Sequence, residues 1–312
     1  MPGRALLDLL LARISDAAGG VKLFEFRHPQ GRVLPAADAG SHIELHLPKG
    51  FVRQYSLLDA SDAPEAYHVA VKRDAAGRGA SRWLHDAARE GFRFLVGAPE
   101  NGFPLTEEAP CSVLIAGGIG IAPIRCMIAR LDALGRDWRL HYAARSRAEA
   151  AFADELTEHG ERARIYVEDA VLDIEATVAA ASPDAHLYCC GPRAMLQAFE
   201  RATVAHDPAR IHTEYFFPRH EPTLGGFTLE LARSRREVAV PRGQTILDAL
   251  LEAGVNVPHA CLEGLCGRCE VSVLAGTPDH RDEYLSPARR AAGRTIVTCR
   301  SGVIGDRLTL DL

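Results

Sequence analysis

The spacing of four cysteines near the C-terminus constrains this chain more than any other feature. Cys261 and Cys266 are separated by four residues, Cys266 and Cys269 by two, and Cys299 follows after a gap of 29 residues. This is the ligand spacing of a plant-type [2Fe–2S] cluster, in which four thiolates hold two irons. We therefore expect these four cysteines to bind such a cluster.

Two other kinds of metal site fit this segment less well. A structural zinc site usually carries two C-x2-C pairs, and only one is present. A Rieske centre has two histidine ligands, and although His259 precedes the loop, the chain contains no Cys-x-His pair. Gly264 and Gly267 lie between the cysteines and allow the loop to turn tightly. The [2Fe–2S] cluster is therefore preferred.

Composition and the remaining cysteines indicate an intracellular globular protein. The other cysteines are spread along the chain, as in a reducing compartment, and Cys111, Cys126 and Cys189 are expected to be core thiols. The net charge of −5 argues against binding nucleic acid through charge. The longest uncharged apolar run, 113–124, is too short to cross a membrane. The leucines of 6–11 are expected in a first strand rather than a signal segment, so we predict a cytoplasmic protein without membrane contact.

The hydrophobic pattern divides the chain into three domains. Residues 1–107 show short runs of alternating apolar residues, for example at 42–47, which predict antiparallel strands. Residues 108–222 alternate buried strands with amphipathic helices, which predicts a parallel α/β sheet. A linker-like composition at 217–226 ends this domain, and residues 223–312 return to a β-rich pattern that contains the cysteines.

Two strand ends in the middle domain carry glycines. Gly117-Gly118-Ile119-Gly120 follows a buried strand and opens a helix, where backbone amides and the helix dipole favour a phosphate. Cys190-Gly191-Pro192 also ends a strand, and ligands of such sheets bind where the strands end. Cys189 and Cys190 must point to opposite sides, so at most one of them faces a ligand. A tight strand-to-helix turn without a ligand is the open alternative.

A second anion site is suggested in the first domain. In Arg53-Gln54-Tyr55-Ser56, arginine, aromatic ring and hydroxyl could bind a phosphorylated ring system. Residues 77–81 then open a predicted helix, whose N-terminus favours an anion. A surface arginine and a core tyrosine are the alternative.

Together these motifs resemble the phthalate dioxygenase reductase family, close to vanillate O-demethylase reductases. The resemblance covers nearly the whole chain in order, and its most discriminating feature is the ferredoxin domain at the end. It implies a multidomain α+β fold. The expected parts are an antiparallel FMN-binding β-barrel (1–107), a nicotinamide-binding α/β domain with a parallel sheet and a terminal linker (108–222), and a β-grasp plant-type ferredoxin domain (223–312).

The resemblance also implies cofactor contacts. The FMN contacts are Arg53, Gln54, Tyr55, Ser56, Ala70, Val71, Lys72, Gly79, Ala80, Ser81 and Phe216. The NADH contacts are Gly117, Gly118, Ile119, Gly120, Arg145, Arg147, Cys190, Gly191 and Pro192, with Cys190 near the nicotinamide. The chain departs from the family at Arg147, where an acidic residue often binds the ribose of NADH and an arginine could bind a 2′-phosphate. NADH is nevertheless the expected coenzyme. The family's glycine is replaced by Ala80, a small change if φ is negative there.

The implied activity is electron transfer from NADH through FMN and the [2Fe–2S] cluster to a Rieske-type oxygenase component. No side chain is needed as an acid or base, because the cofactors carry the chemistry. The resemblance suggests that the oxygenase acts on an aromatic acid or a methoxy-aromatic compound, and we expect the reductase to be a monomer. The alternatives are a non-enzymatic iron–sulfur redox sensor with a vestigial flavin domain and a reductase that serves a non-Rieske acceptor.

Overall fold

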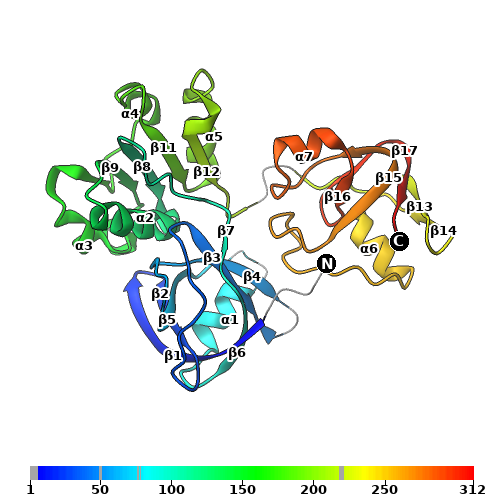
Figure 1. Cartoon of the computed structure of the whole chain (residues 1–312), viewed down its shortest axis with the longest axis horizontal. Helices are drawn as coiled ribbons and strands as arrows, with labels where there is room; N and C mark the ends of the chain where they lie inside the picture. The colour runs from blue at the N-terminus through cyan, green and yellow to red at the C-terminus, as the bar shows by residue number, and fades with distance from the viewer. Residues whose placement is uncertain (1–5, 49–50, 76, 78, 218–220) are drawn as a thin grey trace. The chain divides into compact units, whose positions relative to one another are not determined.

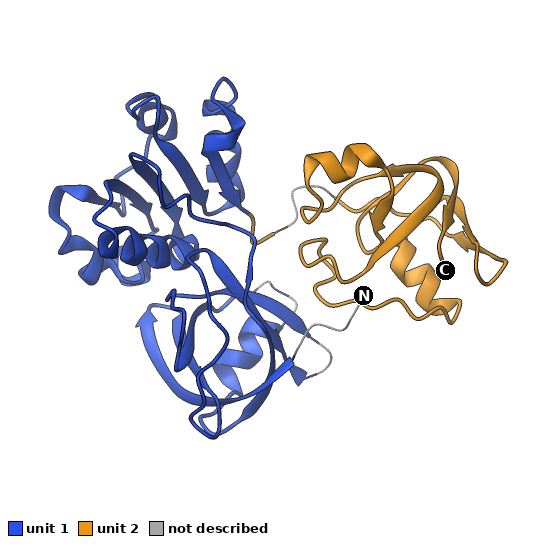
Figure 2. Ribbon diagram, viewed as in Figure 1, with its two compact units in different colours: residues 1–214 blue, residues 215–312 orange. Residues whose placement is uncertain are grey.

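The computed structural model contains two compact units, residues 1–214 and 215–312 (Figure 2). It describes residues 6–48, 51–75, 77, 79–217 and 221–312. Arg78, beside the predicted FMN segment, and residues 218–220 of the predicted linker lie outside this set. Unit 1 (residues 1–214) contains two sheets, and unit 2 (residues 215–312) contains a third. The three-domain division, with ends at 107 and 222, stays a prediction.

The first sheet of unit 1 is the predicted antiparallel β-barrel (Figure 1). Its strands run in the order β4-β3-β6-β1-β2-β5, and β7 pairs with β3. An isolated bridge between Leu57 and Val69 brings the end of β4 to β5 and closes the sheet. The leucine-rich N-terminal segment is β1, as predicted. The strands are β1 (Leu6–Ala18), β2 (Val21–Arg27), β3 (Ser41–His46), β4 (Val52–Ser56), β5 (Ala66–Lys72), β6 (Arg93–Gly97) and β7 (Glu100–Asn101), and α1 is Ala80–Asp86.

The second sheet of unit 1 is parallel, as its pattern predicts, in the order β10-β9-β8-β11-β12. Every residue of the central strand β8 (Ser112–Gly117) is buried, which explains why all its residues after Ser112 are apolar or glycine. Helix α2 (Ile121–Ala133) follows β8 after one 3₁₀ turn, Gly118–Gly120. The other elements are β9 (Trp138–Ala143), α3 (Ala153–Thr157), β10 (Ala163–Tyr166), α4 (Ile174–Ala179), β11 (His186–Cys190), α5 (Arg193–Ala202) and β12 (Ile211–Glu214).

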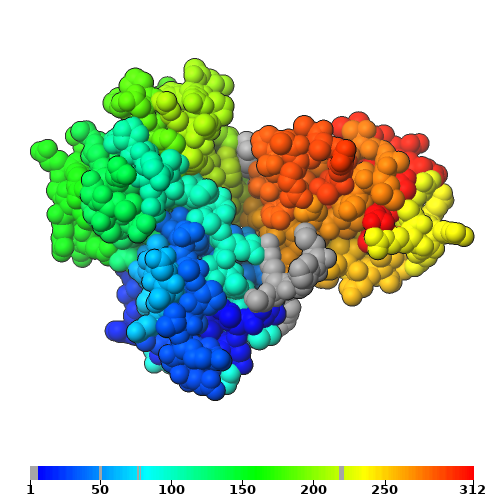
Figure 3. All heavy atoms as spheres, viewed as in Figure 1, coloured from blue at the N-terminus to red at the C-terminus, as the bar shows by residue number. Residues whose placement is uncertain are grey.

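The barrel and the parallel sheet share one hydrophobic core. Val21, Leu58 and Phe103 from the barrel side belong to the same buried cluster as Ile121 and Met127 of α2. The space-filling view shows the blue and cyan atoms of the barrel in contact with the green atoms of the parallel sheet (Figure 3). Burial of apolar surface on both sides packs the two sheets against each other.

Unit 2 contains the sheet β14-β13-β17-β15-β16 around its own core. Thr245 and Asp248 form a capping box at the start of α6 and stop the helix from fraying. No helix among the described residues is long and apolar enough to cross a membrane. The elements are β13 (Phe227–Leu231), β14 (Arg236–Val240), α6 (Ile246–Glu252), β15 (Glu270–Asp279), α7 (Pro287–Ala292), β16 (Thr295–Val297) and β17 (Gly302–Leu310).

Candidate cofactor sites

The four C-terminal cysteines converge in unit 2. All are buried; Cys266 and Cys299 hydrogen-bond Cys261, and Cys299 also hydrogen-bonds Cys269. These thiol contacts, with amide donors such as the Glu263 N–H at 3.3 Å, lower the pKa of Cys261. A thiolate that accepts amide hydrogen bonds is the form that binds iron. The convergence fits an all-cysteine cluster.

Close packing holds the cysteine loop against its neighbours. A Cβ at Gly267 would overlap the ring of Tyr284, and one at Gly264 would lie 2.7 Å from Cγ of Arg300, so both positions require glycine. Both also have positive φ, +72° at Gly264 and +66° at Gly267. Among the residues that the structure describes, no three His, Cys, Asp or Glu side chains form a site for a single ion.

The turn that carries Cys299, directly after β16, is tied to the loop by Thr298. The amide and hydroxyl of Thr298 both donate to the carbonyl oxygen of Cys269, at 3.2 and 2.9 Å. Its own carbonyl oxygen accepts from the amide of Leu247 in α6. A fully buried threonine therefore fixes the fourth cysteine relative to the other three.

The two glycine-bearing strand ends of unit 1 meet, as predicted. A Cβ at Gly117 would lie 2.5 Å from Cδ of Pro192, and one at Gly120 would overlap the carbonyl oxygen of Cys190. Gly118 has φ +54° and no atom within 4 Å of a Cβ position, so there is open space beside the turn at this residue. The turn 117–120 thus packs closely against the end of β11, and space remains beside Gly118. A dinucleotide phosphate requires such an arrangement.

A pair formed by the buried Cys190 and the partly buried Glu214 lies at the ends of β11 and β12, beside this turn. The two residues are paired in register, and the Cys190 thiol donates to Oε2 of Glu214 at 3.9 Å. Burial raises the pKa of Cys190 and raises that of Glu214 to about 8, so the carboxyl is neutral at pH 7. The sequence prediction missed Glu214, although it lies two residues before Phe216, one of the positions that the family resemblance singles out.

The pKa of Glu214 makes stability depend on pH. Between its ordinary pKa of 4.5 and about 8, the folded protein holds a proton that the unfolded chain has lost, so rising pH reduces the free energy of unfolding. Glu214→Gln removes this loss. We expect its melting midpoint to gain on wild type from roughly pH 5 to pH 8 and then to stay level. Glu175→Gln, at an exposed position, is the control. A difference in melting midpoint between Glu214→Gln and wild type that stays constant with pH would mean that the Glu214 carboxyl is already ionised in the folded protein, and would contradict the prediction.

The predicted coenzyme arginines lie after β9. The Arg147 guanidinium pairs with Asp154 at 2.6 Å, and its amide donates to Glu168. The Arg145 carbonyl oxygen accepts from the Glu168 amide. Both side chains of the Arg147–Asp154 pair are solvent-exposed, so the pair is weak and does not decide between NADH and NADPH.

The predicted flavin segments meet at Phe51. The Arg53 guanidinium lies 5.4 Å from the Phe51 ring centroid and donates to the Val52 carbonyl oxygen. A Cβ at Gly79, at the start of α1, would lie 3.9 Å from the same ring. Gly79 has φ +107°, whereas Ala80 is already helical, so the alanine there causes no strain. The Phe51 ring therefore lies next to both the Arg53 guanidinium and the start of α1.

The other side chains of the predicted flavin segments differ in how they are placed. Ala70 packs in the shared core and Val71 in the barrel core, so only their backbone could touch a ring. Lys72 pairs with Glu149 at 3.3 Å, across to the parallel sheet. Burial raises the pKa of Tyr55, which stays a neutral hydrogen-bonding phenol. The Gln54, Ser56 and Ser81 contacts stay predictions, as does that of Phe216, a 40% exposed residue of unit 2.

Of the predicted core thiols, Cys126 and Cys189 are buried, with 1% and 0% of their surface exposed. Cys111 is only partly buried, so the prediction is wrong for this residue. It lies just before β8 rather than inside it, because the strand begins at Ser112.

Arg53→Ala is expected to weaken FMN retention. Charge-assisted hydrogen bonds contribute about 1.5–3 kcal/mol, so FMN affinity should fall roughly tenfold or more. The measurement is flavin content after dialysis, compared with Arg93→Ala, which removes an arginine that pairs with Asp8 on the same barrel. Unchanged flavin content in the first variant would remove Arg53 from the site.

Comparison with known proteins decides the family. Residues 229–303 match the model of the 2Fe-2S iron-sulfur cluster binding domain. The chain is 50% identical over 312 residues to phenoxybenzoate dioxygenase subunit beta of Ectopseudomonas oleovorans, covering 99% of this chain and 98% of that protein. It also matches the structure of phthalate dioxygenase reductase, a modular structure for electron transfer from pyridine nucleotides to [2Fe-2S], with TM-score 0.76 and 35% identity over 99% and 98% of the two chains. The chain belongs to the phthalate dioxygenase reductase family.

The reductase is thus an electron-transfer oxidoreductase with a [2Fe–2S] domain, and its predicted α+β fold is confirmed. It also matches the structure of an intact type IV self-sufficient cytochrome P450 monooxygenase, with TM-score 0.87 and 38% identity. That match covers 98% of this chain and 41% of the other.

Proposed function

We propose that the reductase transfers electrons from NADH, through FMN and a [2Fe–2S] cluster, to the Rieske-type oxygenase component of an aromatic-acid oxygenase. The observation that supports this most is the match over 99% of the chain to a protein named as a dioxygenase subunit. One chain carries a glycine-rich site, an arginine site and a cysteine site, which agrees with the proposal.

The residues have separate tasks in this proposal. Cys261, Cys266, Cys269 and Cys299 hold the cluster. The amides around Gly118 bind the coenzyme phosphates, and Cys190 with neutral Glu214 lines the nicotinamide end without adding charge. Arg53 and the start of α1 bind the FMN phosphate. When bound, FMN takes two electrons as hydride from NADH and delivers them singly to the one-electron cluster.

An aromatic carboxylate is the substrate class that we propose for the oxygenase, because phenoxybenzoate appears in the name of the relative that is 50% identical. Substrate choice lies in the oxygenase, not in this chain. None of the eight cysteines, all of which the structure describes, forms a disulfide, which together with the use of NADH suits a cytoplasmic protein, and we expect a monomer that makes no membrane contact.

A haem protein is the second candidate acceptor. The similar P450 monooxygenase is described as self-sufficient, and this chain corresponds to 41% of it. The same three-site arrangement could therefore serve a haem iron.

Acceptor competition tests the proposal. Holoprotein with NADH is mixed with a purified Rieske dioxygenase that acts on phenoxybenzoate, or with a bacterial P450, and product formation per NADH is measured. Coupled turnover with the dioxygenase alone supports the proposal. Coupling only to the P450 would favour the haem acceptor. Failure of NADH to reduce the bound flavin would overturn both and leave a redox sensor.

A further inference from the structure

Arg125 joins both sheets of unit 1. It lies on α2, five residues after Gly120, the last glycine of the turn 117–120 (the nucleotide turn). Its Nη1 donates to the Leu58 carbonyl oxygen at 3.2 Å and lies 3.6 Å from Oδ1 of Asp59. Its Nε donates to Oε1 and Oε2 of Glu155 at 2.9 and 3.1 Å. The side chain is 23% exposed, so this is not a freely solvated surface pair.

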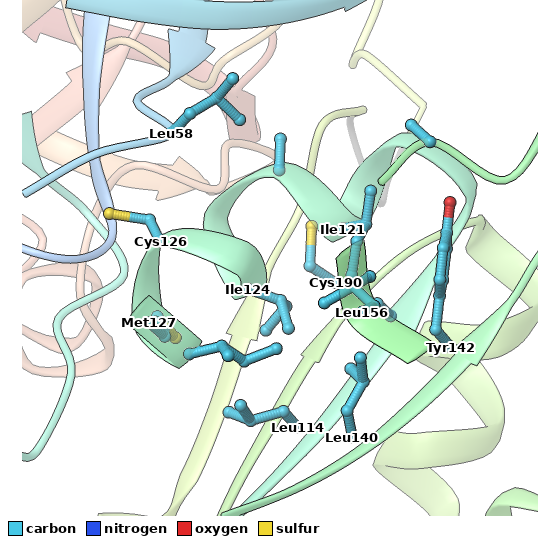
Figure 4. Close-up of a cluster of buried hydrophobic side chains, with 14 of the residues drawn as sticks. Leu58, Leu114, Ile121, Ile124, Cys126, Met127, Leu140, Tyr142, Leu156 and Cys190 are labelled. Atoms are coloured by element: carbon cyan, nitrogen blue, oxygen red, sulfur yellow. The ribbon is translucent and has the colours of Figure 1, made fainter. Parts of the chain in front are cut away.

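The partners of Arg125 lead directly to the two binding segments. Leu58 and Asp59 follow β4, the strand that carries Arg53 and Tyr55. Leu58 approaches α2 beside Cys126, the residue next to Arg125, and both are buried (Figure 4). One guanidinium therefore connects the end of the flavin strand to the helix that starts at the nucleotide turn.

Two further contacts orient this connection. Asp59 is held from its other side by Nδ1 of His68 on β5, at 2.7 Å. The Arg125 guanidinium also lies 5.0 Å from the ring centroid of Phe152, which caps α3 with φ 61°. A bulky residue in this left-handed conformation costs about 1–2 kcal/mol, so its surroundings must hold it there.

We propose that Arg125 is a positioning residue that sets the distance between nicotinamide and flavin during hydride transfer. The inference rests on the proposed function. The hydride carries two electrons from NADH, leaving NAD⁺, and is taken up with one solvent proton to give reduced FMN. A displacement of about 1 Å can slow such a reaction roughly a hundredfold. Loss of the Arg125 contacts should therefore slow hydride transfer more than it weakens NADH binding. The shared apolar core remains and should preserve the fold.

The test is anaerobic single-turnover reduction of the FMN-loaded holoprotein by NADH. In Arg125→Gln we expect the limiting rate of flavin reduction to fall roughly tenfold to a hundredfold, with Kd for NADH, FMN content and melting midpoint near wild type. The isotope effect with NADH deuterated at the transferred position should rise, because hydride transfer limits the rate more fully. Arg125→Lys keeps the charge but not the planar fork and should recover part of the rate.

Arg130→Gln is the matched control. Arg130 lies on the same helix but pairs with Glu107, which precedes β8 in the chain. It should reduce flavin at the wild-type rate. A wild-type rate in Arg125→Gln would overturn the inference, as would a loss that follows FMN content or melting midpoint. If the Gln variant does not fold, the same measurement on Arg125→Lys decides. Absence of flavin reduction in the wild type would instead overturn the proposed function.

Discussion

Cys266→Ser is expected to abolish NADH-dependent reduction of cytochrome c while leaving NADH-driven flavin reduction near the wild-type rate. Cys266 is buried and hydrogen-bonds Cys261, so it is central to the thiol group that would hold the irons. Serine is a poor ligand for a site that requires four thiolates. The flavin and nucleotide segments lie in unit 1, which has its own core and should be unaffected.

Three measurements make this prediction specific. Iron and acid-labile sulfide content should fall, cytochrome c reduction should vanish, and single-turnover flavin reduction should persist. Cys111→Ser, a partly exposed thiol of unit 1, is the control and should change none of them. Loss of flavin reduction in Cys266→Ser with FMN still bound would contradict the proposed linear order of electron carriers.

The cluster and the sheets could be predicted because their signals are local. Ligand spacing follows from the number of residues that a loop needs to surround two irons, and alternation follows from the two faces of a strand. Strand β11 (His186–Cys190) ends at Cys190, as predicted. Helix α2 begins at Ile121, directly after the glycine turn that is predicted to open it, and Pro123 is tolerated because it lies in the first turn of the helix.

Contacts between distant segments could not be predicted in this way. Glu214 and Cys190 come together only because β12 pairs in parallel with β11, and their shifted pKa values depend on the burial that the sheet creates. Arg125 is one arginine among many in the sequence, and its partners Leu58 and Glu155 lie 67 and 30 residues away. Such roles depend on register and packing, which spacing does not encode.

The joint between the two glycine-bearing strand ends leads to the second large effect, that of Gly120→Ala. Gly120 has φ −61°, a value open to any residue, so a loss would come from space alone. A Cβ there would overlap the Cys190 carbonyl oxygen and lie 2.9 Å from the Gly191 nitrogen. Backbone atoms cannot rotate away, so the end of β11 must shift.

We therefore expect Gly120→Ala to lower the free energy of unfolding by about 1–3 kcal/mol, the range for overpacking. The KM for NADH should rise at least tenfold, because the shifted strand end carries the Cys190-Gly191-Pro192 part of the proposed site. Melting curves and steady-state kinetics with an artificial one-electron acceptor give both values. Gly102→Ala is the control, since its Cβ would meet His42 only at an ordinary 3.8 Å. Equal, small effects in both variants would mean that the strand ends are not held as closely as their packing indicates.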